Sequence, residues 1–193
     1  EGPLKELAEQ INQGAKNLDR RVNELRDIAK SERGILQVVL KSLDIEAVIR
    51  DAVKYMSLEA NSKNISLTLD IPQKLPGVKG DCDRIYQVLL NLLNNSIKYT
   101  ASGGSINVIA QTVEDEIVVA VKDTGCGMTA DEIEKIFSPE YTTKEKGVGL
   151  GIPLANEIIR GHGGEIRVIS RKGEGTKFEV VLPRESIQEK SPL

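Results

Sequence analysis

Residues 83–100 read DRIYQVLLNLLNNSIKYT and predict one long amphipathic helix. Apolar residues recur along it at steps of three and four, which is the spacing of a single buried helix face. Those residues are Leu89, Leu92, Leu93 and Ile97. Asp81 lies just upstream and is a typical N-cap residue, so we expect a helix from Asp81 to about Tyr99. One apolar stripe of this kind packs on a second layer of structure.

The same helix carries three asparagines within five residues, Asn91, Asn94 and Asn95. Asparagine disfavours helix interiors because its side chain competes for backbone hydrogen bonds. Asn91 and Asn95 are four residues apart and share a face. Amide oxygens suit Mg²⁺, which keeps several waters and binds phosphate oxygens, and Lys98 would then meet those phosphates. From spacing alone, three solvated surface amides explain the pattern equally well.

A second pattern, Asp123-Thr124-Gly125-Cys126-Gly127-Met128, directly follows an apolar strand. A carboxylate at a strand end can accept a hydrogen bond from an exocyclic amine such as that of adenine. The two glycines allow the backbone to approach a ligand closely. A plain turn is the alternative, because Asp-x-Gly is common in turns.

A third pattern is glycine-rich and leads into a helix: Gly147-Val148-Gly149-Leu150-Gly151. Glycines before a helix expose amides that can bind phosphate. No Gly-Lys-Ser/Thr follows and no strand directly precedes, which excludes a Walker loop and a dinucleotide fingerprint. Residues 137–146 lack periodicity, so we expect residues of about 138–149 to be mobile without nucleotide. The fourth pattern, Gly173-Glu174-Gly175-Thr176, reads by itself as a hairpin turn.

Periodicity along the rest of the chain predicts a two-layer α/β sandwich with a mixed sheet. Hairpins replace strict βαβ alternation, which disfavours a doubly wound parallel sheet. Asp44 is expected to cap a helix that begins at Ile45. The expected elements are about three helices (45–56, 81–99 and 152–160) and five strands (66–71, 105–111, 116–122, 165–170 and 176–182). Residues 35–43 read as a short extended stretch, and residues 124–151 show little periodicity.

Residues 4–33 predict a separate amphipathic helix whose narrow apolar stripe suits a helical hairpin or bundle. We therefore expect three parts: residues 1–34, a globular domain over 35–184, and a polar tail over 185–193. Gly34 is a plausible helix stop.

Composition excludes several classes of protein. The 193 residues are 39% apolar and 28% charged, and only 3% are aromatic, which predicts an aliphatic core. The net charge of −3 argues against a nucleic-acid binder. The sequence contains no apolar run long enough to predict a membrane span, and no signal peptide is evident. Cys82 and Cys126 form no disulfide framework, and His162 is the single histidine, which nearly excludes zinc.

In this order, the four patterns resemble the N box and the first, second and third glycine boxes of sensor histidine kinases. Gly80-Asp81-Cys82-Asp83-Arg84 resembles the entry to the N box, Phe137-Ser138-Pro139 the F box, and His162-Gly163-Gly164 the turn before the penultimate strand. The resemblance covers residues 35–183. Residues 4–34 are similar to the second helix of the dimerisation and histidine-phosphotransfer hairpin.

This resemblance implies an ATP-binding domain of the Bergerat type, with Mg²⁺. Asn95 would hold the metal and Asn91 would assist, while Tyr99 would pack along the adenine. Asp123 would accept a hydrogen bond from the adenine amino group. Thr176 resembles the residue that supports this carboxylate. Of the residues near phosphate, Lys98, Lys144 and Asn91 would take the catalytic roles.

The remaining nucleotide contacts follow from the glycine boxes. The wall beside the adenine would be shaped by Gly125 and Gly127. The phosphates would lie along the second glycine box, and a lysine of the lid would reach the γ-phosphate. These residues are Gly147, Gly149, Leu150 and Gly151, with Lys144 or Lys146.

Three departures from the family pattern matter. Glu140 stands where the F box usually has a second aromatic, and Val148 replaces a frequent threonine. No phosphoacceptor histidine is present, because the family counterpart of His162 is not phosphorylated. We interpret the chain as a C-terminal part of a longer kinase, with a degenerate kinase as the alternative, and expect no autophosphorylation by the chain alone.

The resemblance thus implies a cytoplasmic protein histidine kinase that transfers the γ-phosphoryl of ATP to a histidine on the parent's acceptor helix, for relay to a response regulator. The parent is expected to be a homodimer, and its attachment to a membrane through other segments stays open. We expect no nucleic-acid or membrane contact by this segment. A Bergerat-type ATPase is one alternative, although Asn91 stands where such enzymes place a glutamate base. A nucleotide-binding adaptor is the other.

Overall fold

The computed structural model describes Val22 and residues 38–138 and 149–185 of the chain. The chain divides into two units, Glu1–Leu36 and Gln37–Leu193, and the helices and strands named below belong to the second. Several expectations therefore fall outside the described residues. They concern the helix over 4–33, most of the lid over 138–149, the tail beyond residue 185, and Glu140, Lys144, Lys146, Gly147 and Val148.

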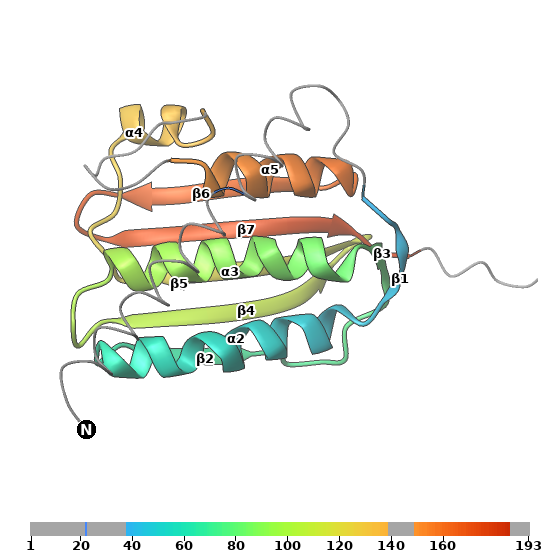
Figure 1. Cartoon of the computed structure of the whole chain (residues 1–193), viewed down its shortest axis with the longest axis horizontal. Helices are drawn as coiled ribbons and strands as arrows, with labels where there is room; N and C mark the ends of the chain where they lie inside the picture. The colour runs from blue at the N-terminus through green and yellow to red at the C-terminus, as the bar shows by residue number, and fades with distance from the viewer. Residues whose placement is uncertain (1–21, 23–37, 139–148, 186–193) are drawn as a thin grey trace, which may run out of the picture. The chain divides into compact units, whose positions relative to one another are not determined.

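A five-stranded mixed sheet forms one layer of the second unit (Figure 1). Its order is β2-β4-β5-β7-β6; β2 pairs with β4 in parallel, and the other neighbours are antiparallel. The five strands expected from the sequence are these five, so the mixed sheet is confirmed. Their bounds are β2 (Ser66–Asp70), β4 (Ser105–Val113), β5 (Glu116–Asp123), β6 (Glu165–Arg171) and β7 (Gly175–Pro183).

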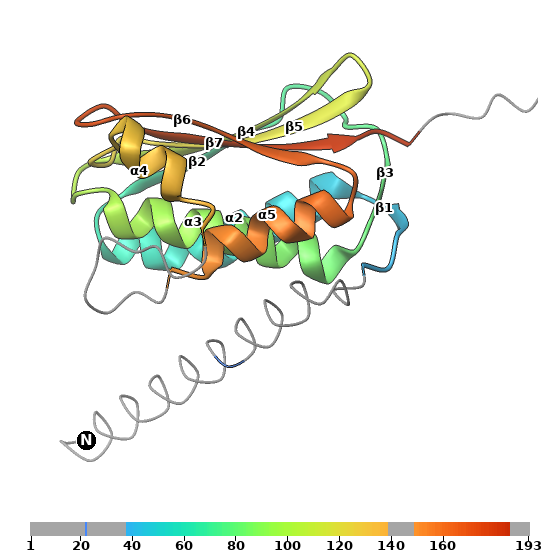
Figure 2. The same ribbon diagram turned by 90° about the horizontal axis from the view of Figure 1, so that it is seen from above.

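Three long helices cover one face of this sheet: α2 (Ile45–Ser62), α3 (Cys82–Tyr99) and α5 (Gly151–Gly161). Figure 2 shows the helices and the sheet as two layers, which confirms the predicted sandwich. The buried apolar residues of the described part are aliphatic, apart from Met56 and Phe178. An aliphatic core is what the low aromatic content predicts.

Both predicted helix caps are formed. Asp44 accepts from the backbone N–H of Ala47 at 3.2 Å and begins α2, and Asp81 accepts from that of Arg84 at 3.2 Å and begins α3. Each cap satisfies a backbone donor that has no partner inside its helix. α3 ends at Tyr99, as expected, so the asparagine-bearing face is held by a helix with defined ends.

Two features were not expected from the sequence. A short helix, α4 (Ala130–Lys135), adds to the three predicted helices and lies within the region expected to be irregular. A small antiparallel pair, β1 (Lys41–Leu43) with β3 (Val78–Gly80), also adds to the five-stranded sheet. No helix within the described ranges is both long enough and apolar enough to cross a bilayer.

Candidate nucleotide-binding site

Asp123 ends β5 and is 4% exposed. Its Oδ1 accepts from the backbone N–H groups of Gly125 at 2.9 Å and Thr176 at 3.2 Å. Its Oδ2 accepts from the Ser96 hydroxyl at 3.0 Å. A carboxylate has about four acceptor positions, so these three bonds fix the group and leave one position on Oδ2.

Burial makes the charge of Asp123 costly. Desolvation raises the pKa of this carboxyl above its ordinary value, while the hydrogen bonds from Gly125, Ser96 and Thr176 act in the opposite direction. A buried carboxylate that keeps an acceptor position is suited to a ligand with an N–H donor.

Glycines allow the backbone to close tightly around Asp123. A Cβ on Gly125 would lie 2.7 Å from the Tyr99 carbonyl oxygen, and one on Gly175 would lie 2.0 Å from the Asp123 carbonyl oxygen. Gly127 has φ +61°, and a Cβ there would lie 1.9 Å from the Arg171 carbonyl oxygen. Side chains at these positions would force the backbone apart. Steric crowding therefore explains why Gly125 and Gly127, the two glycines predicted to shape the wall, are glycines.

The asparagine face of α3 meets the beginning of α5. Asn91 is 8% exposed, and its Nδ2 donates to the Gly151 carbonyl oxygen at 3.2 Å. Asn95, one turn later, is half-buried. At the end of α3, the Lys98 ammonium lies 5.3 Å from the centre of the half-buried Tyr99 ring. The structure thus brings Asn91 and Gly151 together. The other three predicted site residues, Asn95, Lys98 and Tyr99, lie on the same helix as Asn91.

The N-cap residue of α5 is Leu150, whose side chain cannot accept a hydrogen bond, and among the described residues no side chain caps this helix. Gly149, just before it, has φ +70°, a conformation that glycine adopts without strain. Uncapped amides at a helix N-terminus favour an anion such as phosphate.

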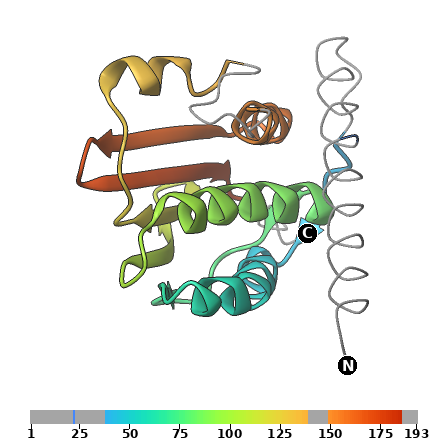
Figure 3. The same ribbon diagram turned by 60° about the vertical axis from the view of Figure 1, so that its left-hand side comes forward.

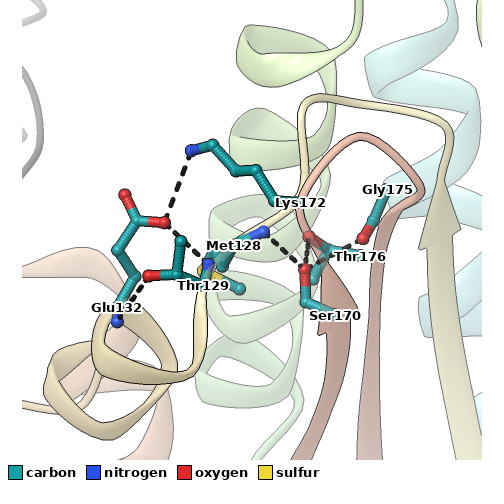
Figure 4. Close-up of polar contacts among 7 residues, drawn as sticks. All are labelled: Met128, Thr129, Glu132, Ser170, Lys172, Gly175 and Thr176. Atoms are coloured by element: carbon teal, nitrogen blue, oxygen red, sulfur yellow. Dashed lines mark hydrogen bonds and ion pairs between the residues drawn. The ribbon is translucent and has the colours of Figure 1, made fainter.

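A second set of polar contacts joins the segment after β5 to the β6–β7 hairpin (Figure 4). The Ser170 hydroxyl accepts from the Met128 N–H at 2.8 Å and lies 2.9 Å from both the Gly175 carbonyl oxygen and Thr176 Oγ1. Within the same junction, Gly173 donates to the Cys126 carbonyl oxygen at 2.8 Å. Thr176, expected to support Asp123, does contact it, through its backbone N–H.

α4 is anchored to the same hairpin, and Figure 3 shows it on the β6 side of the sheet. Thr129 and Glu132 form a reciprocal capping box, with bonds of 3.3 and 2.8 Å between side chain and backbone. Lys172 of the hairpin contacts Glu132 at 3.4 Å. The Thr129 N–H, and more weakly Lys172, lower the pKa of Glu132.

His162 lies away from these groups, at the C-terminus of α5. It is 4% exposed. Its Nε2 accepts from the backbone N–H of Asp81 at 2.9 Å, and its Nδ1 lies 2.7 Å from the Ile158 carbonyl oxygen. An acceptor at Nε2 and a donor at Nδ1 define the neutral Nδ1–H tautomer. Both nitrogens therefore have structural partners.

Sequence reasoning missed Ser96 and Ser170, which complete the surroundings of Asp123. Ser96 lies 27 positions from Asp123 and Ser170 lies 47, and only the fold brings them together. An isolated serine carries no spacing signal, so neither was predictable. Within the described residues, no cluster of three or more His, Cys, Asp and Glu could hold a metal ion.

Residues 80–186, more than half of the chain, match the model of the family described as histidine kinase-, DNA gyrase B-, and HSP90-like ATPase. The sensor histidine kinase ZraS of Escherichia coli strain K12 is 36% identical over 182 residues, covering 94% of this chain and 38% of that protein. The chain thus spans less than two fifths of the length of this relative.

Two solved structures are similar across the fold. Full-length ShkA in complex with AMPPNP has a TM-score of 0.83 and 26% identity, covering 94% of this chain and 39% of that one. The catalytic domain of the histidine kinase ThkA, in a nucleotide-free form, has a TM-score of 0.69 and 30% identity, covering 75% of this chain and 97% of that domain.

Proposed function

The chain belongs to the histidine kinase-, DNA gyrase B- and HSP90-like ATPase family and carries the ATP-binding catalytic part of a sensor histidine kinase, and we propose that this part transfers the γ-phosphoryl group of ATP to a histidine that the chain does not contain. The phosphoryl group then passes to a response regulator. ThkA, a similar kinase, has been solved in complex with the response regulator TrrA. The parent protein acts as a homodimer, and this part of it works in the cytoplasm.

The observation that carries the proposal is the fixed carboxylate of Asp123. Three hydrogen bonds hold it, and one acceptor position remains on Oδ2. That position receives the amino group of adenine, while Tyr99 packs along the base and Gly125 and Gly127 shape the wall. Because the carboxylate is held before the ligand arrives, little ordering is lost on binding.

Phosphate binding is assigned to the junction of α3 and α5. The uncapped amides at Gly151 and the preceding residues Gly149 and Leu150 lie along the phosphates. Lys98 supplies positive charge from α3. Lys144, Lys146 and Gly147 are expected to approach from the lid; they lie outside the described residues, and their roles stay predictions.

The asparagine face suits a magnesium ion that arrives with the nucleotide. Asn91 donates its Nδ2 to the Gly151 carbonyl, which turns its Oδ1 away from that oxygen. Asn95 follows on the same face. Neutral amide oxygens fit Mg²⁺, which prefers oxygen ligands and retains several waters. When bound, the ion would neutralise charge on the phosphates. We assign Asn95 to hold the ion and Asn91 to assist.

Hydrolysis is the weaker alternative because of Asn91. An amide cannot take a proton from water, as a general base must. Asn91 is also a donor to the Gly151 carbonyl, a bond that a glutamate carboxylate in this place could not make. Catalysis is therefore assigned to positioning and charge neutralisation for transfer, with Asn91, Lys98 and Lys144 in these roles.

His162 is not the acceptor in this proposal. Both of its ring nitrogens have backbone partners, and it caps the C-terminus of α5, while the phosphates are assigned to the N-terminus. Phosphoryl transfer needs a nucleophile in line with the γ-phosphate at near-contact distance. The helix of eleven residues between these ends separates them by roughly 15 Å.

A transfer assay tests the proposal. The chain is incubated with Mg-ATP, alone and with a separately made histidine-bearing hairpin helix pair, and intact masses are measured at alkaline pH. We expect phosphate on the supplied histidine and none on His162. Asn95→Ala should abolish this transfer. The control is Asn61→Ala, which changes an exposed asparagine on α2 and should leave the transfer unchanged. Phosphate mapped to His162, or ATP consumed without any phosphohistidine, would overturn the assignment.

A further inference from the structure

Ser170 lies on β6, the edge strand, and is none of the residues assigned to touch the nucleotide. Its hydroxyl nevertheless joins three groups from two segments: the Met128 N–H at 2.8 Å, the Gly175 carbonyl oxygen at 2.9 Å and Thr176 Oγ1 at 2.9 Å. Figure 4 shows all three contacts converging on this single oxygen.

The direction of these bonds follows from counting protons. Ser170 has one proton, and the Gly175 carbonyl oxygen can only accept, so the proton goes to Gly175. The Thr176 hydroxyl must then donate to Ser170, which also accepts from Met128. In the opposite arrangement, two oxygens without a proton between them would lie 2.9 Å apart. Every hydrogen-bonding position of the Ser170 hydroxyl is thus used.

These partners lead directly to Asp123. Thr176, whose side chain bonds Ser170, donates its backbone N–H to Asp123 Oδ1 at 3.2 Å. Gly175, the other hairpin partner, packs against the backbone of Asp123 so closely that only a glycine fits. Met128 ends the glycine segment that begins with Gly125, another donor to Asp123. Ser170 therefore holds both segments that flank the carboxylate.

We propose that Ser170 is a positioning residue that fixes the base-recognising carboxylate of Asp123, through Thr176, Gly175 and Met128, and thereby sets the preference for a purine with a 6-amino group. The inference rests on the proposed nucleotide site. Without the Ser170 hydroxyl, the Met128 N–H and the Gly175 carbonyl oxygen lose their shared partner, and the backbone bond from Gly173 to Cys126 remains to join the hairpin to the glycine segment. Asp123 then samples more positions, and binding must restore the productive one.

The test compares two nucleotides that differ at position 6 of the purine: ADP, which has an amino group, and IDP, which has an oxo group. Dissociation constants are measured by calorimetry with Mg²⁺ for the wild type and for Ser170→Ala and Ser170→Thr. Ser66→Ala, an exposed serine on the opposite edge strand β2, is the matched control. Thermal unfolding of each variant without nucleotide is recorded in parallel.

For Ser170→Ala, we expect ADP affinity to fall by about two- to tenfold, the worth of one hydrogen bond, with a smaller loss for IDP. The ratio of the IDP to the ADP dissociation constant therefore falls. Ser170→Thr keeps the hydroxyl and should restore this ratio, and Ser66→Ala should match the wild type. If Ser170→Ala does not fold, Ser170→Cys replaces it, because a thiol is a weaker partner.

Unchanged ADP affinity in Ser170→Ala would overturn the inference. Equal losses for ADP and IDP, or a loss that Ser170→Thr does not restore, would reduce Ser170 to a general structural role and also overturn it. A wild type that binds ADP no better than IDP would remove the proposed recognition by Asp123 itself, and with it the role of Ser170.

Discussion

Two glycines of the β6–β7 turn differ in what surrounds them, although both have positive φ. Gly173 has φ +84° and nothing within 4 Å of an added Cβ, whereas Gly175 has φ +92° and the Asp123 carbonyl oxygen at 2.0 Å. Gly173→Ala should cost about 1–2 kcal/mol of unfolding free energy, from backbone strain alone. Gly175→Ala should cost about 1–3 kcal/mol more, because the backbone must move.

Urea unfolding of both variants measures this difference, with Gly173→Ala as the strain control. Gly175→Ala should also weaken nucleotide binding, since it displaces Asp123. Equal stability of the two variants would mean that β7 does not approach Asp123 as closely as described.

Asp123 should leave a signature in the pH dependence of stability. Burial raises its pKa in the folded state above the ordinary value of 3.8. The folded state therefore binds a proton more readily than the unfolded state, so this group stabilises the fold at acid pH and destabilises it as pH rises through the raised value. Asp123→Asn lacks this titration. Its unfolding free energy, relative to that of the wild type, should increase from acid to neutral pH in urea titrations; a difference independent of pH would contradict the buried charge.

Some residues of the site could be predicted from the sequence and others could not. Asp123, Gly125 and Gly127 form a local pattern, a carboxylate and glycines after a strand, whereas Thr176 was expected only from the resemblance to the family. Ser96 and Ser170 were not predicted, because a serine hydroxyl is informative only when its partners are known. Those partners come from other segments of the chain, and the fold alone assembles them.

At the scale of elements, α4 depends on its capping box. It has six residues and none of them is buried, so packing contributes little to it. Thr129→Ala removes the cap and should cost about 1 kcal/mol locally. We expect faster amide exchange over residues 130–135, whereas Glu132→Gln, which keeps an acceptor for the Thr129 N–H, should exchange nearly as the wild type does. Identical exchange in Thr129→Ala would show that the cap does not hold α4.

His162 connects α5 to the beginning of α3. His162→Phe keeps an aromatic ring but leaves the Asp81 N–H without its acceptor, which should cost about 1–3 kcal/mol of unfolding free energy. His162→Gln retains an acceptor and should cost less. Chemical denaturation compares the two. A phenylalanine variant as stable as the wild type would remove this structural role and reopen the function of the histidine.

Element prediction succeeded where the signal was long and local. The two helices with an aspartate cap and the five strands of the sheet were predicted from periodicity and capping. β3 was missed because three residues carry no period; it exists through pairing with β1 and a bridge from Val78 to Arg184. α4 was missed although its Thr129-x-x-Glu132 box was visible, because its helix lacks an apolar face.

For the whole molecule, the sandwich explains why distant patterns form one site. β5 and β7 are neighbours in the sheet, which places Asp123 opposite Thr176. α3 and α5 pack side by side on one face (Figure 1), which brings Asn91 to Gly151. Base recognition is thus assigned to the sheet end and phosphate recognition to the helix layer. The order of the motifs in the sequence predicted which residues form the site. The distances between those residues follow only from the fold.

Calorimetric titration of Mg-ADP into the wild type and Asp123→Asn tests the central claim most directly. In this variant the amide oxygen can keep the bonds to Gly125 and Thr176, and the amide nitrogen can donate to Ser96, so the fold should persist. The position that faces adenine becomes a donor, however, and an unmatched buried pair costs about 1–3 kcal/mol, or roughly ten- to hundredfold in affinity. We predict saturable binding to the wild type and a loss of that size in Asp123→Asn; equal affinities in two folded proteins would contradict the assignment of this site.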